Sequence, residues 1–216
     1  MRQLSYATGL VLSIFLLGGA AQATSFAPNV DFRESAFQPS GAVSSFSATS
    51  HGYHVTIETL KLTGGGLVSN GRLYWNDEDG YGIIGAGYEN DEIELPEVLR
   101  ISFGSSTYIE SALVSDLYLE RKYAETGKYS LDGGSSWTWF QADGQHSNGE
   151  VSIPLSVWAD AILFTAPGKI GKQTHEFSVA GLELGRGYSA AAPEPGAALL
   201  FGVGLALVGR RASRRS

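Results

Sequence analysis

The sequence contains no cysteine and only one methionine among its 216 residues. Without cysteine the chain cannot form a disulfide, a thiolate zinc site, an iron–sulfur cluster or a thiol nucleophile. Its stability must therefore come from a packed core or from bound metal. Basic residues are also scarce, because 15 Lys and Arg face 22 Asp and Glu, which gives a formal net charge of −7.

Long apolar runs are confined to the two ends of the chain. Arg2 precedes an apolar run over residues 4–17, and a small-residue pattern, Ala-Gln-Ala, follows at residues 21–23. This order predicts a signal peptide over residues 1–23, with cleavage after Ala23. The alternative is an uncleaved anchor helix, for which the apolar run is short.

The C-terminal end combines a Pro-Glu-Pro motif, an apolar stretch over residues 196–209 and a cluster of arginines. Arginines after an apolar span favour the cytoplasmic side of a membrane. At about 1.5 Å per residue, some 14 helical residues cover about 21 Å of a hydrocarbon core about 30 Å thick, so the span is short. The residues of this signal are Pro193, Glu194, Pro195, Arg210, Arg211, Arg214 and Arg215.

This combination resembles the PEP-CTERM sorting signal of Gram-negative bacteria over residues 190–216. The resemblance implies that signal peptidase and then exosortase, an integral-membrane cysteine protease, process the chain. It implies a precursor anchored in the inner membrane with a periplasmic ectodomain, followed by delivery to the cell surface or outside the cell. It also implies a link to exopolysaccharide, which the hosts usually make. A simple tail anchor is the alternative.

The middle of the chain, residues 24–189, is long enough for one domain with a sizeable core. Taking away both ends removes five of the 15 basic residues but only one of the 22 acidic ones, which leaves a net charge of −11. Such an acidic domain disfavours nucleic acid as a partner, because phosphates repel it. It favours divalent cations or a solvated extracellular surface.

Short alternating apolar runs recur through this middle part. One starts at Tyr53 and ends at Thr63 and the three glycines of residues 64–66. Further runs, each ended by turn residues, lie at 99–103, 113–119, 151–155, 162–164 and 177–184. Residues 25–50 are expected to be irregular with one short strand. The pattern predicts an all-β domain, an antiparallel β-sandwich of jelly-roll type, flanked by the signal helix and a transmembrane sorting helix.

Oxygen-bearing side chains are crowded over residues 75–94. Calcium takes six to eight oxygen ligands, and carboxylates that lack such an ion repel one another. The spacing is not that of an EF-hand, because with Gly80 as the loop glycine Trp75 would occupy the first ligand position. We expect a calcium site of another geometry, and a solvated acidic loop is the alternative. The candidate ligands are Asp77, Asp79, Asp91 and Glu92.

Residues 130–137 read Ser-Leu-Asp-Gly-Gly-Ser-Ser-Trp and resemble the Asp-box of sialidases and related β-proteins. The resemblance implies a hairpin turn in which Ser130 and Asp132 satisfy loop amides, Gly134 allows the turn and Trp137 packs beneath it. One box in about 170 residues cannot build a six-bladed sialidase propeller. We therefore interpret the motif as a structural turn.

Several aromatic rings could stack on sugar rings if they are exposed, and Trp75 and Tyr81 in the acidic segment are the first candidates. The others are Tyr88, Trp137, Trp139 and Trp158. Trp137 and Trp139 share one face of a strand, and burial in the core is the favoured interpretation for them.

These observations predict a non-enzymatic exported protein of the cell surface or extracellular matrix, associated with exopolysaccharide and binding sugar with calcium. One alternative is a secreted glycoside hydrolase or lyase with a carboxylate pair such as Glu110 and Asp116. Another is a purely structural coat protein that self-associates.

Overall fold

The computed structural model describes residues 28–85, 92–120, 123–144, 148–168, 170 and 175–185. The predicted signal peptide, residues 1–23, and the predicted sorting signal, residues 190–216, lie outside them. In the described part of the chain, no helix is long and apolar enough to cross a membrane. The elements are β1 (Val30–Asp31), the 3-10 helix η1 (Ser35–Phe37), β2 (Ser45–Ser50), β3 (Tyr53–Thr63), β4 (Gly66–Ser69), β5 (Arg72–Asn76), β6 (Gly80–Ile84), β7 (Glu97–Ser115), β8 (Leu119–Glu120), β9 (Tyr123–Ala124), β10 (Thr126–Ser130), β11 (Thr138–Gln141), β12 (Val151–Thr165) and β13 (Ser178–Gly185).

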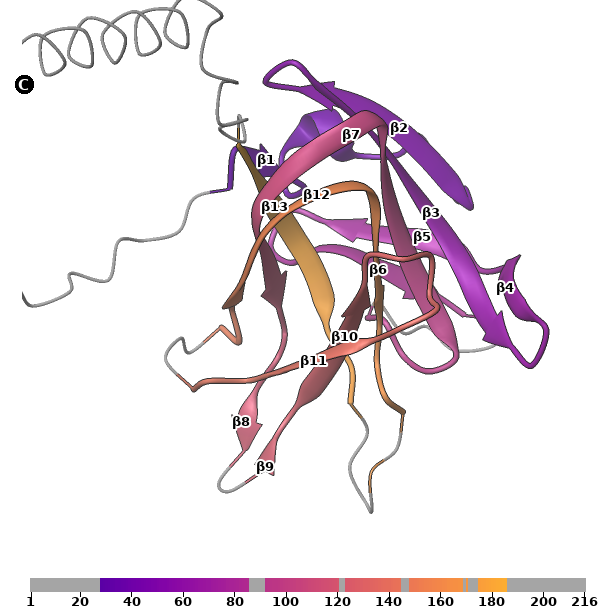
Figure 1. Cartoon of the computed structure of the whole chain (residues 1–216), viewed down its shortest axis with the longest axis vertical. Coiled ribbons are helices and arrows are strands. Elements are labelled where there is room, and N and C mark those ends of the chain that lie inside the picture. Colours follow the sequence, from indigo (N-terminus) through magenta and orange to yellow (C-terminus); the bar gives the residue numbers. More distant parts are fainter. Residues whose placement is uncertain are drawn as a thin grey trace, which may run out of the picture.

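The described strands confirm the prediction of an all-β, antiparallel domain. An 11-stranded sheet has the order β11-β10-β12-β7-β13-β6-β5, and β3 joins it by pairing with β7. β3 in turn carries β2 and β4, and β1 pairs with β13. β8 and β9 form a separate two-stranded pair, which projects from the lower end of the domain in Figure 1.

Two long strands, β7 and β12, bend and so curl the sheet over its own core. The first half of β7 pairs with β3 and the end of β12, whereas its second half pairs with β13 and the start of β12. The β12 ladder is irregular between Pro154 and Val157 and again between Ala159 and Ala161, and Ser156 has a φ of 53°. Bulges of this kind bend a strand locally. Both strands arch over the top of the domain in Figure 1.

The two halves of the curled sheet enclose one large apolar core. From β3 the side chains of Val55 and Ile57 point inward, as the alternation predicts, and His54, which precedes Val55, is exposed. Each fully buried aliphatic side chain of this kind contributes about 1.5 to 3 kcal/mol. They meet core residues of β6, β7, β12 and β13, including Ile83, Leu99, Ile101, Ile162, Phe164, Val179 and Leu182.

The described part of residues 25–50 is more regular than its composition suggests, because it contains β1 and η1 as well as β2. Phe32 and Phe37 are fully buried, with ring centroids 5.1 Å apart. Phe32 also lies edge-on to Tyr81, at 5.7 Å between centroids. Phe32 and Phe37 of this Ser- and Pro-rich segment are therefore part of the main core, and Phe46 packs against it.

A smaller apolar cluster lies on the outer face of the β3–β7–β12 half of the sheet. Leu60, Val98 and Leu163 form it, each one position away from a core-facing side chain of the same strand. Leu67 of β4 and Trp137 of the β10–β11 turn pack against it. The turn that resembles an Asp-box therefore anchors itself on the outside of the sheet.

Candidate functional site

The proposed calcium ligands begin in the β5–β6 turn, where the side chain of Asp77 is exposed. Asn76 organises this turn, since its Oδ1 accepts hydrogen bonds from the backbone N–H of Glu78 (3.0 Å) and Asp79 (2.5 Å). Its Nδ2 donates to Asp79 Oδ2 at 3.0 Å. Asp91 lies outside the described residues. Within the described residues, no group of three His, Asp or Glu side chains is placed to hold a metal ion.

Glu92 and Asp79 nevertheless lie in one neighbourhood, around the hydroxyl of Tyr118. The pKa of Tyr118 is raised, mainly by partial burial. The charge of Asp116 and a hydrogen bond to Asp116 contribute next, and the charges of Asp79 and Glu92 contribute least. Tyr118 Oη donates to Asp116 Oδ1 at 3.2 Å. Asp116 and Tyr118 come shortly after the end of β7, and no spacing in the sequence links them to the acidic segment over residues 75–94.

The turn at residues 130–137 joins β10 to β11 through its own side chains. Ser130 Oγ donates to Asp132 Oδ1 (2.7 Å) and accepts from the Gly134 N–H (2.9 Å). The Asp132 carboxylate accepts from Ser136 Oγ (2.6 Å) and from the Ser136 N–H (2.9 Å). These bonds, with that from Ser130, hold the pKa of Asp132 well below its ordinary value. The carboxylate is thus occupied within the turn.

The two rings first proposed for sugar stacking serve packing instead. Tyr81 is fully buried, because β6 lies between β5 and β13, and its hydroxyl donates to the carbonyl of Phe37. Burial raises the pKa of Tyr81. The proposal that Tyr81 stacks on a sugar is therefore wrong. Trp75 is half-buried against the core, and its Nε1–H donates to the Phe32 carbonyl at 2.6 Å.

Two other tryptophans expose about half of their surface, 54% for Trp139 and 52% for Trp158. The expectation that Trp139 is buried with Trp137 is wrong, because β11 ends the sheet and its outer face is left open. Trp137 alone packs on the outer apolar cluster. The candidate surfaces for a ligand are therefore around Trp158 and Trp139.

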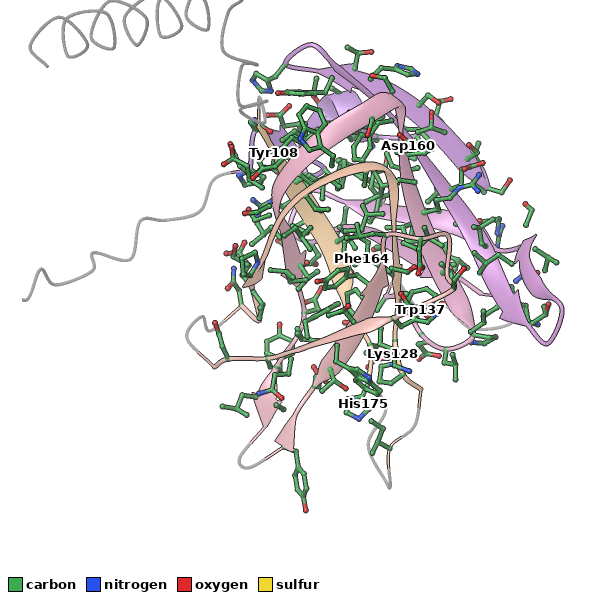
Figure 2. The ribbon with its side chains drawn as sticks, in the orientation of Figure 1. Tyr108, Lys128, Trp137, Asp160, Phe164 and His175 are labelled. Carbon is green, nitrogen blue, oxygen red and sulfur yellow. The ribbon has the colours of Figure 1, made fainter. Side chains whose placement is uncertain are left out.

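Trp158 and Tyr108 form an aromatic pair where β12 runs beside β7. They are direct partners across the two strands, with ring centroids 5.6 Å apart and planes tilted by 60°. Their neighbours Ala159 and Ile109 are buried in the core, so the alternation of a strand directs Trp158 and Tyr108 outward. Figure 2 places Tyr108 near the arch formed by β7 and β12.

Glu110 and Gly185 extend this pair to the next strand. Gly185 of β13 is the strand partner of Tyr108. A Cβ atom at Gly185 would collide with the Glu110 carboxyl group, so that group lies directly over the glycine. Glu110 is exposed and is two positions from Tyr108, on the same face of β7. We call Trp158, Tyr108, Glu110 and Gly185 the Trp158 platform.

The Trp158 platform combines a flat apolar surface with hydrogen-bonding groups. An indole ring can cover the C–H face of a pyranose, while a carboxylate offers several acceptor positions to hydroxyl groups. Tyr108 adds a phenolic group that both donates and accepts. The residues belong to three paired strands, and sites on regular elements are more rigid than sites on loops.

The carboxylate pair of the enzymatic alternative is not brought together. Glu110 lies in the second half of β7, and Asp116 follows the last residue of that strand. Six extended residues cover about 20 Å, at about 3.3 Å each. The two carboxyl groups of a glycosidase lie about 5 to 10 Å apart. Glu110 and Asp116 therefore cannot act as acid and nucleophile on one glycosidic bond.

No protein-family model matches the chain, and no curated protein matches it. Among solved structures, the X-ray structure of GH31 CBM32-2 bound to GalNAc matches it with a TM-score of 0.29 and 14% sequence identity. The match covers 61% of this chain and 97% of that chain. A TM-score this low does not establish a common fold, so any ligand of this chain has to be inferred from its own side chains.

Proposed function

We propose that this chain is an exported, non-enzymatic carbohydrate-binding protein of the cell surface or extracellular matrix. The observation that carries the proposal is the Trp158 platform, in which a half-exposed indole, a tyrosine and a carboxylate share one rigid outward face. The ligand is a hydroxyl-rich sugar within a polysaccharide, which the rings contact by stacking and Glu110 by hydrogen bonds.

The surroundings of the Trp158 platform support a solvent-facing sugar better than a buried protein interface. The arch beside it carries Gly104, Ser105 and Ser106, which are small and exposed. Such residues leave room for an extended polymer and supply few apolar contacts. Protein interfaces instead rely on a desolvated apolar centre.

The ends of the chain supply the delivery part of the proposal. The N-terminal signal, residues 1–23, would start export, and the PEP-CTERM-like end, residues 190–216, would hold the precursor in the inner membrane until exosortase processes it. The product would then associate with the exopolysaccharide of the producing cell. We also infer a jelly-roll-like sandwich, because β12 inserts in the sheet between β7 and β10, two strands that both precede it in the chain.

Calcium remains part of the proposal as a stabilising ion near the β5–β6 turn. The proposed oxygen ligands are Asp77, Asp79, Asp91 and Glu92. Chelation is expected to lower the thermal midpoint of the wild type, and Asp79→Ala is expected to abolish that response. An Asp79→Ala variant with unchanged calcium affinity would remove the ion from the proposal.

Affinity electrophoresis in gels that contain the producing organism's exopolysaccharide, or plant and bacterial glycans, tests sugar binding. The Trp158→Ala variant is expected to lose at least about tenfold in affinity, as the loss of a central aromatic contact does in other complexes. Trp158→Phe should keep part of the binding. Tyr123→Ala, which removes an equally exposed ring on β9, is the control. Cleavage of the polymer would instead support a hydrolase. Self-association without retention by the glycan would support a structural coat protein.

A further inference from the structure

The second half-exposed tryptophan has a different chemical neighbour from the first. Trp139 of β11 is the strand partner of Lys128 of β10, and the ammonium Nζ lies 4.2 Å from the centroid of the Trp139 ring. A cation at this distance is held by the ring's quadrupole. We propose that this Lys128–Trp139 pair binds an anionic sugar, such as a uronate, as a second carbohydrate site. The inference rests on the proposed function, which concerns the Trp158 platform.

The charge of Lys128 is available to a ligand. In the part of the chain that the structure describes, ion pairs involve Arg33 and Arg100, and no carboxylate lies within ion-pair distance of Lys128. On the same outer face of the sheet, Arg100 pairs with Glu58 across the β7–β3 ladder. The nearby Asp132 carboxylate is engaged by its own turn.

An unpaired ammonium is notable in a domain with more acidic than basic residues. Most of the molecular surface repels anions, whereas the Lys128–Trp139 pair offers three N–H donors beside a flat ring. A sugar carboxylate can accept a charge-assisted hydrogen bond from Lys128 while the sugar ring lies against the exposed indole. A neutral sugar would gain the stacking without the charged contact, so the pair discriminates by charge.

The two surfaces are too far apart to bind one sugar residue. Thr165 of β12 is the strand partner of Lys128, and it lies seven residues beyond Trp158 on the same strand. Seven extended residues cover about 23 Å along the strand. In the view of Figure 2, Lys128 likewise lies well below Tyr108. One molecule can therefore hold two stretches of polymer, which raises its avidity and allows it to bridge chains.

The test compares binding of the full chain to polygalacturonate and to the methyl-esterified form of the same polymer, at about 50 mM salt, where screening is weak. Lys128→Met keeps the aliphatic stem against Trp139 and removes the charge. It is expected to weaken polygalacturonate binding about tenfold, which one charge-assisted hydrogen bond would account for, and to leave binding of the ester unchanged. Lys61→Met, an exposed lysine of β3, is the control and should behave as the wild type.

The outcomes separate this inference from the proposed function. Equal polygalacturonate binding by Lys128→Met and the wild type, or no preference of the wild type for the charged polymer, would overturn the second site. If Trp158→Ala keeps all binding to neutral glycans while Lys128→Met loses the acidic polymer, the second site stands and the Trp158 platform does not. If Trp158→Ala loses the neutral glycans and Lys128→Met loses the acidic polymer, both the Trp158 platform and the Lys128–Trp139 site are supported.

Discussion

Glu97, the first residue of β7, makes stability depend on pH in an unusual direction. Its side chain is half-buried; Oε2 accepts a hydrogen bond from the Glu94 N–H at 3.1 Å, and the other oxygen lies against Gly85. Burial, with a smaller contribution from the charge of Glu94, raises the pKa of Glu97 from 4.5 to about 7, although the Glu94 N–H acts in the opposite sense. Between these values the folded chain binds more protons than the unfolded chain. This group's contribution to stability is therefore lost as pH rises from 4.5 to 7, and the loss is complete above pH 7.

The magnitude follows from the two pKa values. A difference of that size corresponds to at most about 3 kcal/mol at pH 8. Because the carboxylate keeps contact with water, we expect a cost of about 1 to 2 kcal/mol. Glu97→Gln removes the charge and keeps an oxygen that can accept the hydrogen bond from the Glu94 N–H. The variant should match the wild type near pH 4.5 and be more stable by that amount near pH 8.

Urea denaturation at both pH values measures this difference, and Glu78→Gln, on the exposed β5–β6 turn, is the control. Each variant is compared with the wild type at the same pH, so that the titration of other groups cancels. An unchanged or lower stability of Glu97→Gln at pH 8 would mean that the half-buried Glu97 carboxylate does not destabilise the fold.

Three further stability predictions concern the backbone and the turn. Gly80→Ala should lower the free energy of unfolding, measured by urea denaturation, by at least about 3 kcal/mol, because the new methyl group would strike the β13 backbone. Gly52→Ala, also at positive φ but with open space around it, should lower it by only about 1 kcal/mol. Ser130→Ala should lose about 1 to 3 kcal/mol and change tryptophan fluorescence, since a turn amide loses its acceptor. Burial lowers the pKa of His175, so the wild type loses stability as pH falls below about 6.5. An asparagine at this position can still accept the hydrogen bond from the Thr126 N–H, so thermal melts of His175→Asn should show less of this loss. Equal costs for both glycines, an unaffected turn, or the same acid sensitivity in His175→Asn would contradict these expectations.

The strands were largely predictable because their pattern is local. The alternation at Val55 and Ile57 sets which side of β3 faces the core, and the structure confirms it. The apolar runs at 99–103 and 113–119 were assigned as separate strands, yet β7 continues through the first and into the second. At the bend of β7, residues 104–106 are small, and β12 pairs with β7 on both sides of them, over residues 99–102 and again between residues 107 and 114.

The candidate site could not be predicted from the sequence, because it depends on strand register. Nothing in the spacing links Trp158 to Tyr108, which precedes it by 50 residues, or Gly185 to Glu110. The exposure of aromatic rings was misjudged for the same reason. Tyr81 stands beside acidic residues in the sequence but lies on an interior strand, whereas Trp139 lies on a strand at the end of the sheet.

The chain contains only four tryptophans, so their indole N–H signals can test the central claim directly. We would record these signals by NMR while a bound glycan is titrated into the protein. We expect a neutral glycan to shift the Trp158 signal and to leave that of Trp75, whose N–H is held by the Phe32 carbonyl, in place. A glycan that binds without moving the Trp158 signal, or that moves the Trp75 signal instead, would show that the Trp158 platform is not the sugar-binding surface.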